Sequence, residues 1–251
     1  QHGKTIPDAK GSIQRGIEVV EYATGITDSL KGDHSASVGT NVDSYSMRQP
    51  LGVCAGITPF NFPAMVPMWM YPVAIACGNT FVLKPSEKDP SCPIRLGELA
   101  IEAGMPPGVL NVVNGDKESV DTLLESKDVQ AISFVGSTPI AEYVYHTGTK
   151  NNKRVQALGG AKNHMLVLPD ADLDLAINEC IAGTLSFNGQ RCTALKTVFV
   201  HQSIVKEYID LLKAHKKYGV KDVELKMGDA IVFNHLLLLS GSPQSQRLPG
   251  R

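Results

Sequence analysis

The sequence has few aromatic residues and almost no excess charge of either sign. Aromatic residues make up 6% of its 251 positions, there is one tryptophan, and the formal net charge is −1. Such a balance provides no basic field for nucleic acid and no polybasic patch for a membrane surface. We therefore expect neither of these partners, and the composition favours small-molecule chemistry.

Long hydrophobic runs and metal-binding cysteine patterns are missing as well. The longest apolar stretch, MVPMWMYPVAIAC (65–77), is broken by prolines and too short to span a bilayer. The five cysteines are widely spaced, without a CxxC pair or a nearby histidine cluster. We expect no metal site and no disulfide framework, and we expect Cys54, Cys77 and Cys180 to be reduced, buried thiols.

Short β-branched runs alternate with segments of helical spacing along most of the chain. The predicted strands are 52–57, 80–84, 109–113, 131–135 and 164–168, and the predicted helices are 64–77, 91–103, 117–126, 139–147 and 172–187. This order predicts parallel βαβ units, and hence an α/β fold with a doubly wound, mostly parallel sheet. Because polar alternation is absent, we expect strands buried on both faces, with ligands at their carboxyl ends.

Three stretches depart from this pattern. Residues 37–50 are polar and alternating, which predicts an edge hairpin that projects from the domain. Residues 216–251 lose their periodicity, and we interpret them as an atypical, disordered or mispaired tail. The chain begins without Met, in QHGKTIPDAK, which resembles the interior of a helix, so we expect a fragment.

Two motifs follow predicted strands and suit a nucleotide. In KPSE, Lys84 can donate to ribose hydroxyls or phosphate and Glu87 can accept from them, although a solvated charged turn is an alternative. In SFVGST, Gly136 lets the backbone approach a phosphate closely. Ser137 then opens a helix whose N-terminus favours anions.

Two further motifs suit carbonyl chemistry. In ITPFNFP, Asn61 offers an amide donor at a fixed place, as an oxyanion hole requires, or else it caps the following helix. In NGQRC, Cys192 lies beside Arg191, whose charge favours the thiolate, or else it is a structural cysteine. The pair predicts a nucleophile and an oxyanion donor.

The order PFNFP, KPSE, FVGS, GQRC resembles the aldehyde dehydrogenase superfamily, from about residue 1 to about residue 215. Within it, GVCAGITPFNFPAMVPMWMYPVAIACGNTFVLKPSE, AISFVGS and RVQALGGAKNH are similar to the acylating methylmalonate-semialdehyde dehydrogenase branch. The resemblance implies an NAD-binding domain at 1–36 and 51–160, an oligomerisation hairpin at 37–50 and a partial catalytic α/β domain at 161–215. NAD is the implied cofactor and CoA the implied acyl acceptor.

Site residues follow from the same resemblance. Cys192 matches the family's nucleophile and Asn61 its oxyanion donor. The implied cofactor-binding residues are Thr58, Phe60, Lys84, Glu87, Lys88, Gly136 and Ser137. Arg15 and Arg191 match the pair that binds a substrate carboxylate.

The resemblance also implies the reaction. The Cys192 thiolate attacks an aldehyde, hydride leaves for NAD, and a thioester remains. Most members carry a Glu before LGG that activates water, whereas this chain has Ala157 in QALGGAK. Transfer to CoA is the expected exit, giving propionyl-CoA or acetyl-CoA from methylmalonate or malonate semialdehyde.

Two alternatives stay open. SFNGQRCTALK is closer to the non-phosphorylating glyceraldehyde-3-phosphate dehydrogenases of the superfamily, which suggests a non-acylating oxidation. Because family members extend well past this chain, an inactive nucleotide-binding fragment is the other alternative. The resemblance further implies a homo-oligomer, a dimer or tetramer, in the mitochondrial matrix of a eukaryote or the cytoplasm of a bacterium.

Overall fold

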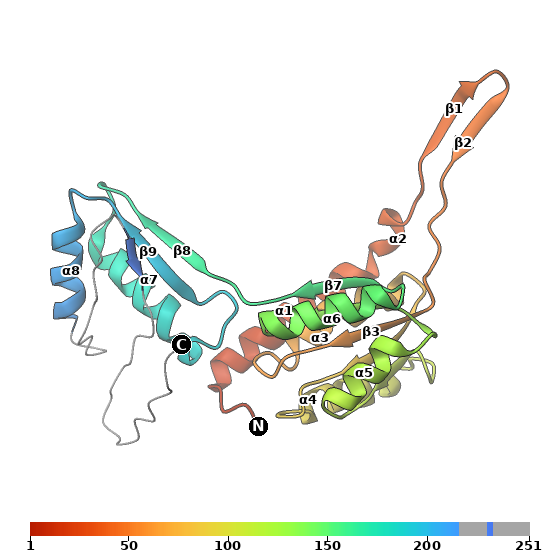
Figure 1. Cartoon of the computed structure of the whole chain (residues 1–251), viewed down its shortest axis with the longest axis horizontal. Coiled ribbons are helices and arrows are strands. Elements are labelled where there is room, and N and C mark those ends of the chain that lie inside the picture. The colour runs from red at the N-terminus through yellow and green to blue at the C-terminus, as the bar shows by residue number, and fades with distance from the viewer. Residues whose placement is uncertain (216–229, 233–251) are drawn as a thin grey trace. The chain divides into compact units, whose positions relative to one another are not determined.

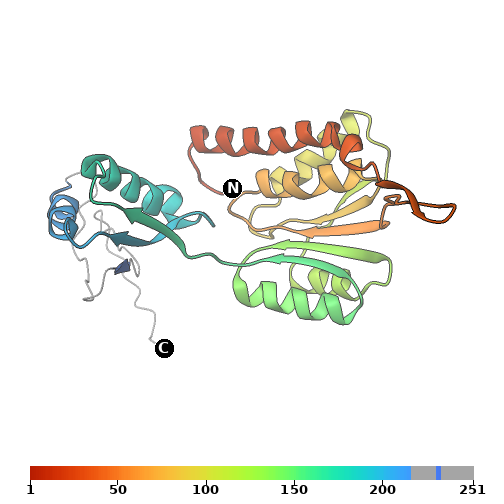
Figure 2. The same cartoon turned by 90° about the horizontal axis from the view of Figure 1, so that it is seen from above.

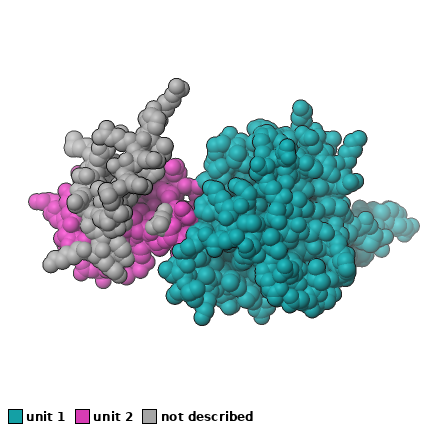
Figure 3. Space-filling view, turned by 90° about the horizontal axis from the view of Figure 1, so that it is seen from below, with its two compact units in different colours: residues 1–160 teal, residues 161–251 magenta. Residues whose placement is uncertain are grey.

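The computed structural model describes residues 1–215 and 230–232. The chain divides into two compact units, a first unit of Gln1–Gly160 and a second unit that begins at Ala161, coloured separately in Figure 3. The first unit contains a sheet of five strands and the second a sheet of three. Each unit also has its own cluster of buried apolar side chains.

Five parallel strands form the sheet of the first unit: β3 (Val53–Ile57), β4 (Thr80–Lys84), β5 (Leu110–Val112), β6 (Val129–Val135) and β7 (Arg154–Leu158). Their order across the sheet is β5-β4-β3-β6-β7. The chain therefore builds outward from β3 in one direction and then in the other, which confirms the predicted doubly wound α/β fold. Ile57 lies opposite Lys84 on one side and Phe134 on the other, so the three central strands end together.

Helices cover both faces of this sheet (Figures 1 and 2). One face is covered by α1 (Ile6–Thr24), α3 (Met65–Ala76) and α4 (Ser91–Glu102), and the short α2 (Ile26–Ser29) follows α1. The other face is covered by α5 (Lys117–Glu125) and α6 (Thr138–Lys150). Leu124 and Val144, both fully buried, pack in the cluster beneath α5 and α6. Cover on two faces explains why β3 and β4 are almost entirely buried.

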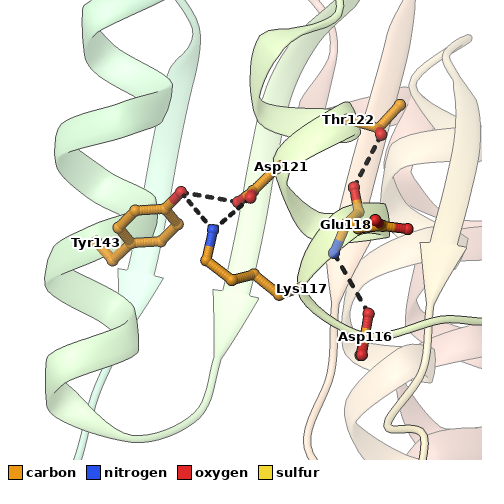
Figure 4. A network of polar contacts seen from close by, with 6 residues as sticks. All are labelled: Asp116, Lys117, Glu118, Asp121, Thr122 and Tyr143. Carbon is orange, nitrogen blue, oxygen red and sulfur yellow. Dashed lines mark hydrogen bonds and ion pairs between the residues drawn. The ribbon is translucent and has the colours of Figure 1, made fainter.

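A polar network joins α5 to α6 (Figure 4). The Tyr143 hydroxyl on α6 donates to Asp121 on α5 at 2.7 Å. The Lys117 ammonium pairs with Asp121 and donates to the Tyr143 hydroxyl at 3.3 Å. The network helps to hold α6, and with it Ser137 at the start of this helix, against α5.

A hairpin projects from the first unit (Figure 1). Its antiparallel strands are β1 (His34–Gly39) and β2 (Val42–Tyr45), and every residue in them is exposed. The strands begin and end earlier than the predicted 37–50 range. Asp33 and Ser46 close the base, because each main-chain amide donates to an oxygen of the other residue at 2.9 Å.

The second unit has the strand order β10-β9-β8. Its elements are β8 (Asn163–Val167), α7 (Leu173–Leu185), the 3₁₀ helix η1 (Ser186–Gly189), β9 (Leu195–Val200), α8 (Val205–Ala214) and β10 (Ala230–Val232). β8 runs parallel to β9, and β10 runs antiparallel to it. Val198 and Tyr208, both fully buried, belong to the core cluster of this unit.

The expectation that the strands are buried on both faces is wrong for β8. Its residues alternate between half-buried and exposed up to the buried Val167, and Leu166 is 71% exposed. Met165 and Val167 pack into the core cluster, and neighbours in a strand point to opposite faces. An apolar run in the sequence did not distinguish this one-sided arrangement from a strand covered twice.

β7, β9 and α8 were not predicted from the sequence. β7 is the edge strand of its sheet, where Val155 and Ala157 pack inward while Arg154 and Gln156 are exposed. Its alternation is short and two of its five residues are polar, so the signal was weak.

The first residues do not lie inside a helix, contrary to expectation. Residues 1–5 precede α1, and the Thr5 hydroxyl caps this helix by accepting from the Asp8 amide. Cys54 and Cys180 are buried as predicted, but Cys77 is only half-buried. Of the predicted tail, 216–251, all but residues 230–232 lies outside the described residues.

Candidate active site

The predicted cofactor residues of the first unit come together at one edge of its sheet. Thr58 follows β3, Lys84 ends β4, and Gly136 follows β6. The Thr58 amide donates to the Lys84 carbonyl at 3.1 Å. β3 is the point from which the chain connections leave in opposite directions, and open α/β sheets bind ligands in the crevice at such a point.

Lys84 and Glu87 form an ion pair at this edge. The Lys84 side chain is 5% exposed and its Nζ lies 3.3 Å from Glu87 Oε2, whereas the Glu87 side chain is 54% exposed. A hydrogen bond from its own main-chain amide, and then the Lys84 ammonium, lower the pKa of Glu87. The edge thus presents an ionised, accessible acceptor beside a fixed donor, as a ribose diol requires.

The Thr58 hydroxyl is a buried polar group at the same edge. Thr58 is 4% exposed, and its Oγ1 has no hydrogen-bond partner among the described residues. Buried hydroxyls in native proteins nearly always have a partner, so one without a protein partner suits contact with a ligand. The burial of the Thr58 hydroxyl and its position at the sheet edge are therefore those expected of a residue that lines a cofactor-binding cleft.

Phe60 and Lys88 also meet at this edge. The Lys88 ammonium lies 4.8 Å from the centre of the Phe60 ring, within the range of a cation–π contact. The His2 ring also stacks on the Phe60 ring, with 5.9 Å between the ring centres and an interplanar angle of 20°. Sequence reasoning missed His2.

Gly136 and Ser137 form the entry to α6. A Cβ at position 136 would lie 2.4 Å from the Phe134 ring, so only glycine fits without movement of that ring. Ser137 occupies the N-cap position with an extended backbone, and its exposed side chain makes no capping hydrogen bond within the part of the chain that the structure describes. A helix start with open amides and a serine hydroxyl suits a phosphate oxygen.

Asn61 lies half-buried in the loop between β3 and α3. Its main-chain carbonyl accepts a hydrogen bond from Lys4 Nζ at 3.0 Å. Ala64, not Asn61, occupies the N-cap position of α3. The contact with Lys4 spans 57 positions, and nothing in the sequence signalled it.

Cys192 is exposed in the second unit, in the loop between η1 and β9. The Asn163 side-chain amide holds this loop by donating to the Cys192 carbonyl at 2.6 Å and to the Ala194 carbonyl at 3.0 Å. Sequence reasoning missed Asn163. Because Cys192 is exposed, its thiol is not enclosed in apolar packing, and it has the accessibility that the predicted nucleophile requires.

The turn before Cys192 has an unusual backbone. Phe187 has φ of 66°, a left-handed conformation that costs energy for an aromatic residue. The Arg191 guanidinium lies 5.3 Å from the centre of the Phe187 ring. Strained residues of this kind gather at functional sites, which fits a turn that presents a nucleophile.

Two further residues, Arg15 and Ala157, bear on the predicted reaction. Arg15 lies on α1 with 71% of its side chain exposed and pairs with Glu18 at 2.9 Å. Ala157 lies in β7 and packs against the core cluster of the first unit. Arg15 and Asn61 belong to the first unit and Arg191 and Cys192 to the second, so their pairing across the units stays a prediction.

Among the described helices, none is both long and apolar enough to cross a bilayer. Within residues 1–215 and 230–232, no three His, Cys, Asp or Glu side chains are grouped so as to hold a metal ion.

Comparisons with known proteins agree with the geometry. A malonate-semialdehyde dehydrogenase of Pseudomonas aeruginosa is 55% identical over 236 residues, covering 92% of this chain and 48% of the relative. A structure from Sinorhizobium meliloti 1021 bears the name methylmalonate-semialdehyde dehydrogenase and was solved in complex with NAD. Its sequence is 56% identical to this chain, and the two structures superpose with a TM-score of 0.82. The methylmalonate-semialdehyde dehydrogenase of Oceanimonas doudoroffii has the same values.

These matches cover only part of each relative. The two structural matches include 85% of this chain but 44% of theirs, so the chain spans about half the length of the relatives. The model of the aldehyde dehydrogenase family matches residues 1–232. With the sheet edge, the exposed cysteine and this match in agreement, the chain belongs to the aldehyde dehydrogenase family.

Proposed function

We propose that this chain carries the cofactor site and the nucleophile of an NAD-dependent, acylating semialdehyde dehydrogenase. Its substrate is methylmalonate or malonate semialdehyde and its product propionyl-CoA or acetyl-CoA. Each product has one acyl carbon fewer than its aldehyde, so the substrate carboxylate leaves as carbon dioxide. The names of the relatives from Pseudomonas aeruginosa and Oceanimonas doudoroffii support this substrate class.

The observation that carries the proposal is the set of residues at the sheet edge. Lys84 and Glu87 fit a ribose, Gly136 and Ser137 fit a pyrophosphate, and the Thr58 hydroxyl fits a ligand in the crevice. These groups match the parts of NAD, and a similar structure was solved with NAD. When bound, NAD supplies the hydride acceptor for aldehyde oxidation.

The second unit supplies the nucleophile. Attack of the Cys192 sulfur on the aldehyde carbon forms a hemithioacetal, whose oxyanion is stabilised by the Asn61 amide. Loss of hydride from that carbon leaves a thioester on Cys192 whose acyl group still carries the substrate carboxylate. Cleavage of the bond to this carboxylate releases carbon dioxide, and a proton added at the α-carbon gives the propionyl or acetyl thioester. Asn163 keeps the cysteine loop in place throughout, through its hydrogen bonds to the Cys192 and Ala194 carbonyls.

Ala157 supports release to CoA. Hydrolysis of a thioester needs a general base to activate water, and a methyl group cannot take the proton. The CoA thiol is a stronger nucleophile than water, so it attacks the thioester carbonyl, and Cys192 leaves as the thiolate. Arg15 and Arg191 are proposed to bind the substrate carboxylate through bidentate hydrogen bonds.

The hairpin β1–β2 is proposed to bind a second copy of the chain in a homo-oligomer, a dimer or tetramer. Its strands are exposed along their whole length, including Val38, Val42 and Tyr45, and unpaired strand edges readily accept another strand. The relatives above are bacterial. The proposed location is the cytoplasm if the source of this chain is bacterial and the mitochondrial matrix if it is eukaryotic.

Cofactor binding is tested first, by calorimetric titration of NAD into the purified chain. We expect measurable binding that weakens at least about tenfold in Lys84→Met, because the ribose loses a charge-assisted donor. Lys10→Met, at an exposed position of α1, is the matched control. Absence of NAD binding by the unaltered chain would overturn the proposal.

Chemistry is tested by NADH absorbance with methylmalonate semialdehyde, with and without CoA. We expect CoA-dependent NADH formation that is lost in Cys192→Ala and retained in Cys77→Ala. NADH with the free acid and no CoA requirement would favour the non-acylating alternative. NAD binding without any NADH would favour an inactive nucleotide-binding fragment.

A further inference from the structure

The stretch before α1 lies directly against the loop that holds Asn61. Lys4 Nζ donates to the Asn61 carbonyl at 3.0 Å and lies 4.7 Å from the centre of the Phe62 ring. His2 stacks on Phe60. Asn61 and both of its aromatic neighbours are therefore contacted by two residues that are distant in sequence.

The position of Lys4 is fixed by the helix that follows. Thr5 caps α1, and α1 packs closely on α3, where a Cβ at Gly16 would come 2.3 Å from the Met68 sulfur. α3 is also the helix that follows the Asn61 loop. Lys4 and Asn61 are thus anchored to two helices in direct contact, which holds their distance constant.

We propose that Lys4 is a positioning residue for Asn61, holding the main chain so that the side-chain amide meets the oxyanion. An ammonium-to-carbonyl hydrogen bond is charge-assisted and roughly twice as strong as a neutral one. It restrains the peptide between Asn61 and Phe62, and with it the direction of the Asn61 side chain. The inference rests on the oxyanion role of Asn61 in the proposed function, and Lys4 itself touches no reacting atom.

A buried carboxylate lies beside Lys4. Asp89 is 4% exposed, its oxygens have no hydrogen-bond partner among the described residues, and it lines a cavity of about 300 Å³ together with Lys4, Ser12 and Cys92. Burial raises the pKa of Asp89 to about 6, while attraction to the Lys4 charge opposes the rise. The Asp89 carboxylate and the Lys4 ammonium, which donates to the Asn61 carbonyl, thus attract each other.

The first test is independent of activity. In the isotope-labelled chain, NMR follows the Asn61 carbonyl carbon and side-chain amide in the unaltered protein, Lys4→Met, Lys4→Arg and Lys10→Met. We expect both signals to shift in Lys4→Met, the amide to broaden, and both to remain near their original positions in Lys4→Arg and Lys10→Met. Unchanged Asn61 signals in a folded Lys4→Met would overturn the inference, whatever the activity.

The second test uses aldehyde oxidation. Displacement of a catalytic group by about 1 Å can cost about 100-fold, so we expect kcat of Lys4→Met to fall roughly 10- to 100-fold. NAD affinity should change less than about twofold, and Lys4→Arg should recover most of the rate. Equal loss of NAD affinity and rate, or no recovery by arginine, would show a purely structural role and overturn the inference. If the unaltered chain forms no NADH, the proposed function fails while the NMR result still stands.

Discussion

The two sheets of this chain differ in how their strands are covered. In the first unit β3 and β4 have helices on both sides and are almost entirely buried. In the second unit β8 alternates, with Val167 2% exposed and Leu166 71% exposed. The first sheet therefore has an interior on both faces, whereas β8 has an interior on one.

In the proposed function, this difference corresponds to a division of roles between the two units. The sheet covered twice provides a rigid edge on which Lys84, Glu87, Gly136 and Ser137 stand at the ends of parallel strands. In the second unit Cys192 stands on a loop, held by a side-chain hydrogen bond from Asn163. A cofactor that spans several strand ends needs residues held at a common sheet edge. A nucleophile needs to be accessible to its substrate more than it needs to be buried.

The largest expected effect comes from shortening one leucine side chain in each unit, which tests the difference in burial between the two sheets. Leu124→Ala leaves a cavity in a fully buried site of the first unit and should cost about 2–5 kcal/mol of unfolding free energy. Leu166→Ala, at an exposed site of β8, should cost less than about 0.5 kcal/mol. Urea denaturation followed by circular dichroism measures both. Similar losses would mean that the outer face of β8 is covered in solution.

A smaller effect is expected at the buried carboxylate of the first unit. The pKa of Asp89 is raised from 3.8 to about 6, so the ionised form is disfavoured in the folded protein. The resulting contribution to stability is present below about pH 4 and is lost as pH rises through 6. Asp89→Asn should therefore raise the unfolding free energy at pH 7.5 by on the order of 1–3 kcal/mol, with no gain at pH 4.

Thermal melts at the two pH values measure this change. Asp28→Asn is the control, because that carboxylate is 82% exposed and pairs with Lys31 on the surface. A gain in Asp89→Asn that is equal at both pH values would show that the amide stabilises the protein by packing and that Asp89 does not titrate as expected.

The smallest effect is expected in the cysteine loop of the second unit. Asn163→Ala removes the hydrogen bonds to the Cys192 and Ala194 carbonyls, at a cost of roughly 1 kcal/mol. Hydrogen exchange should accelerate in residues 190–194 and remain unchanged in the first unit. The control is Asn178→Ala, whose side chain also donates to a carbonyl but within α7. Equal acceleration in both variants would contradict a specific role for Asn163.

Sequence reasoning correctly placed the predicted cofactor-binding residues of the first unit at or after the ends of strands. Lys84 and Gly136 stand out because each comes directly after an apolar run, and parallel strands end at a common edge. It did not identify Lys4, His2 or Asn163. Their contacts depend on residues far along the chain, 57 positions away for Lys4 and 29 for Asn163, and no local pattern records such a distance.

The same limit explains the errors in the fold. β7 was missed because the alternation in RVQAL is only five residues long, and β8 was assigned two buried faces because its run HMLVL has no polar alternation. In β8 the exposed positions include a leucine, so hydrophobicity did not report burial.

The sequence by itself determined the alternation of strands and helices, the doubly wound sheet and the residues placed at its carboxyl edge. Each of these depends on local periodicity and on the direction of parallel strands, which neighbouring residues encode. Only the tertiary structure decided that Lys4 holds Asn61, that Asp89 is buried beside it, and that one face of β8 is exposed. These features arise from packing between distant segments, where burial and charge are set by neighbours in space.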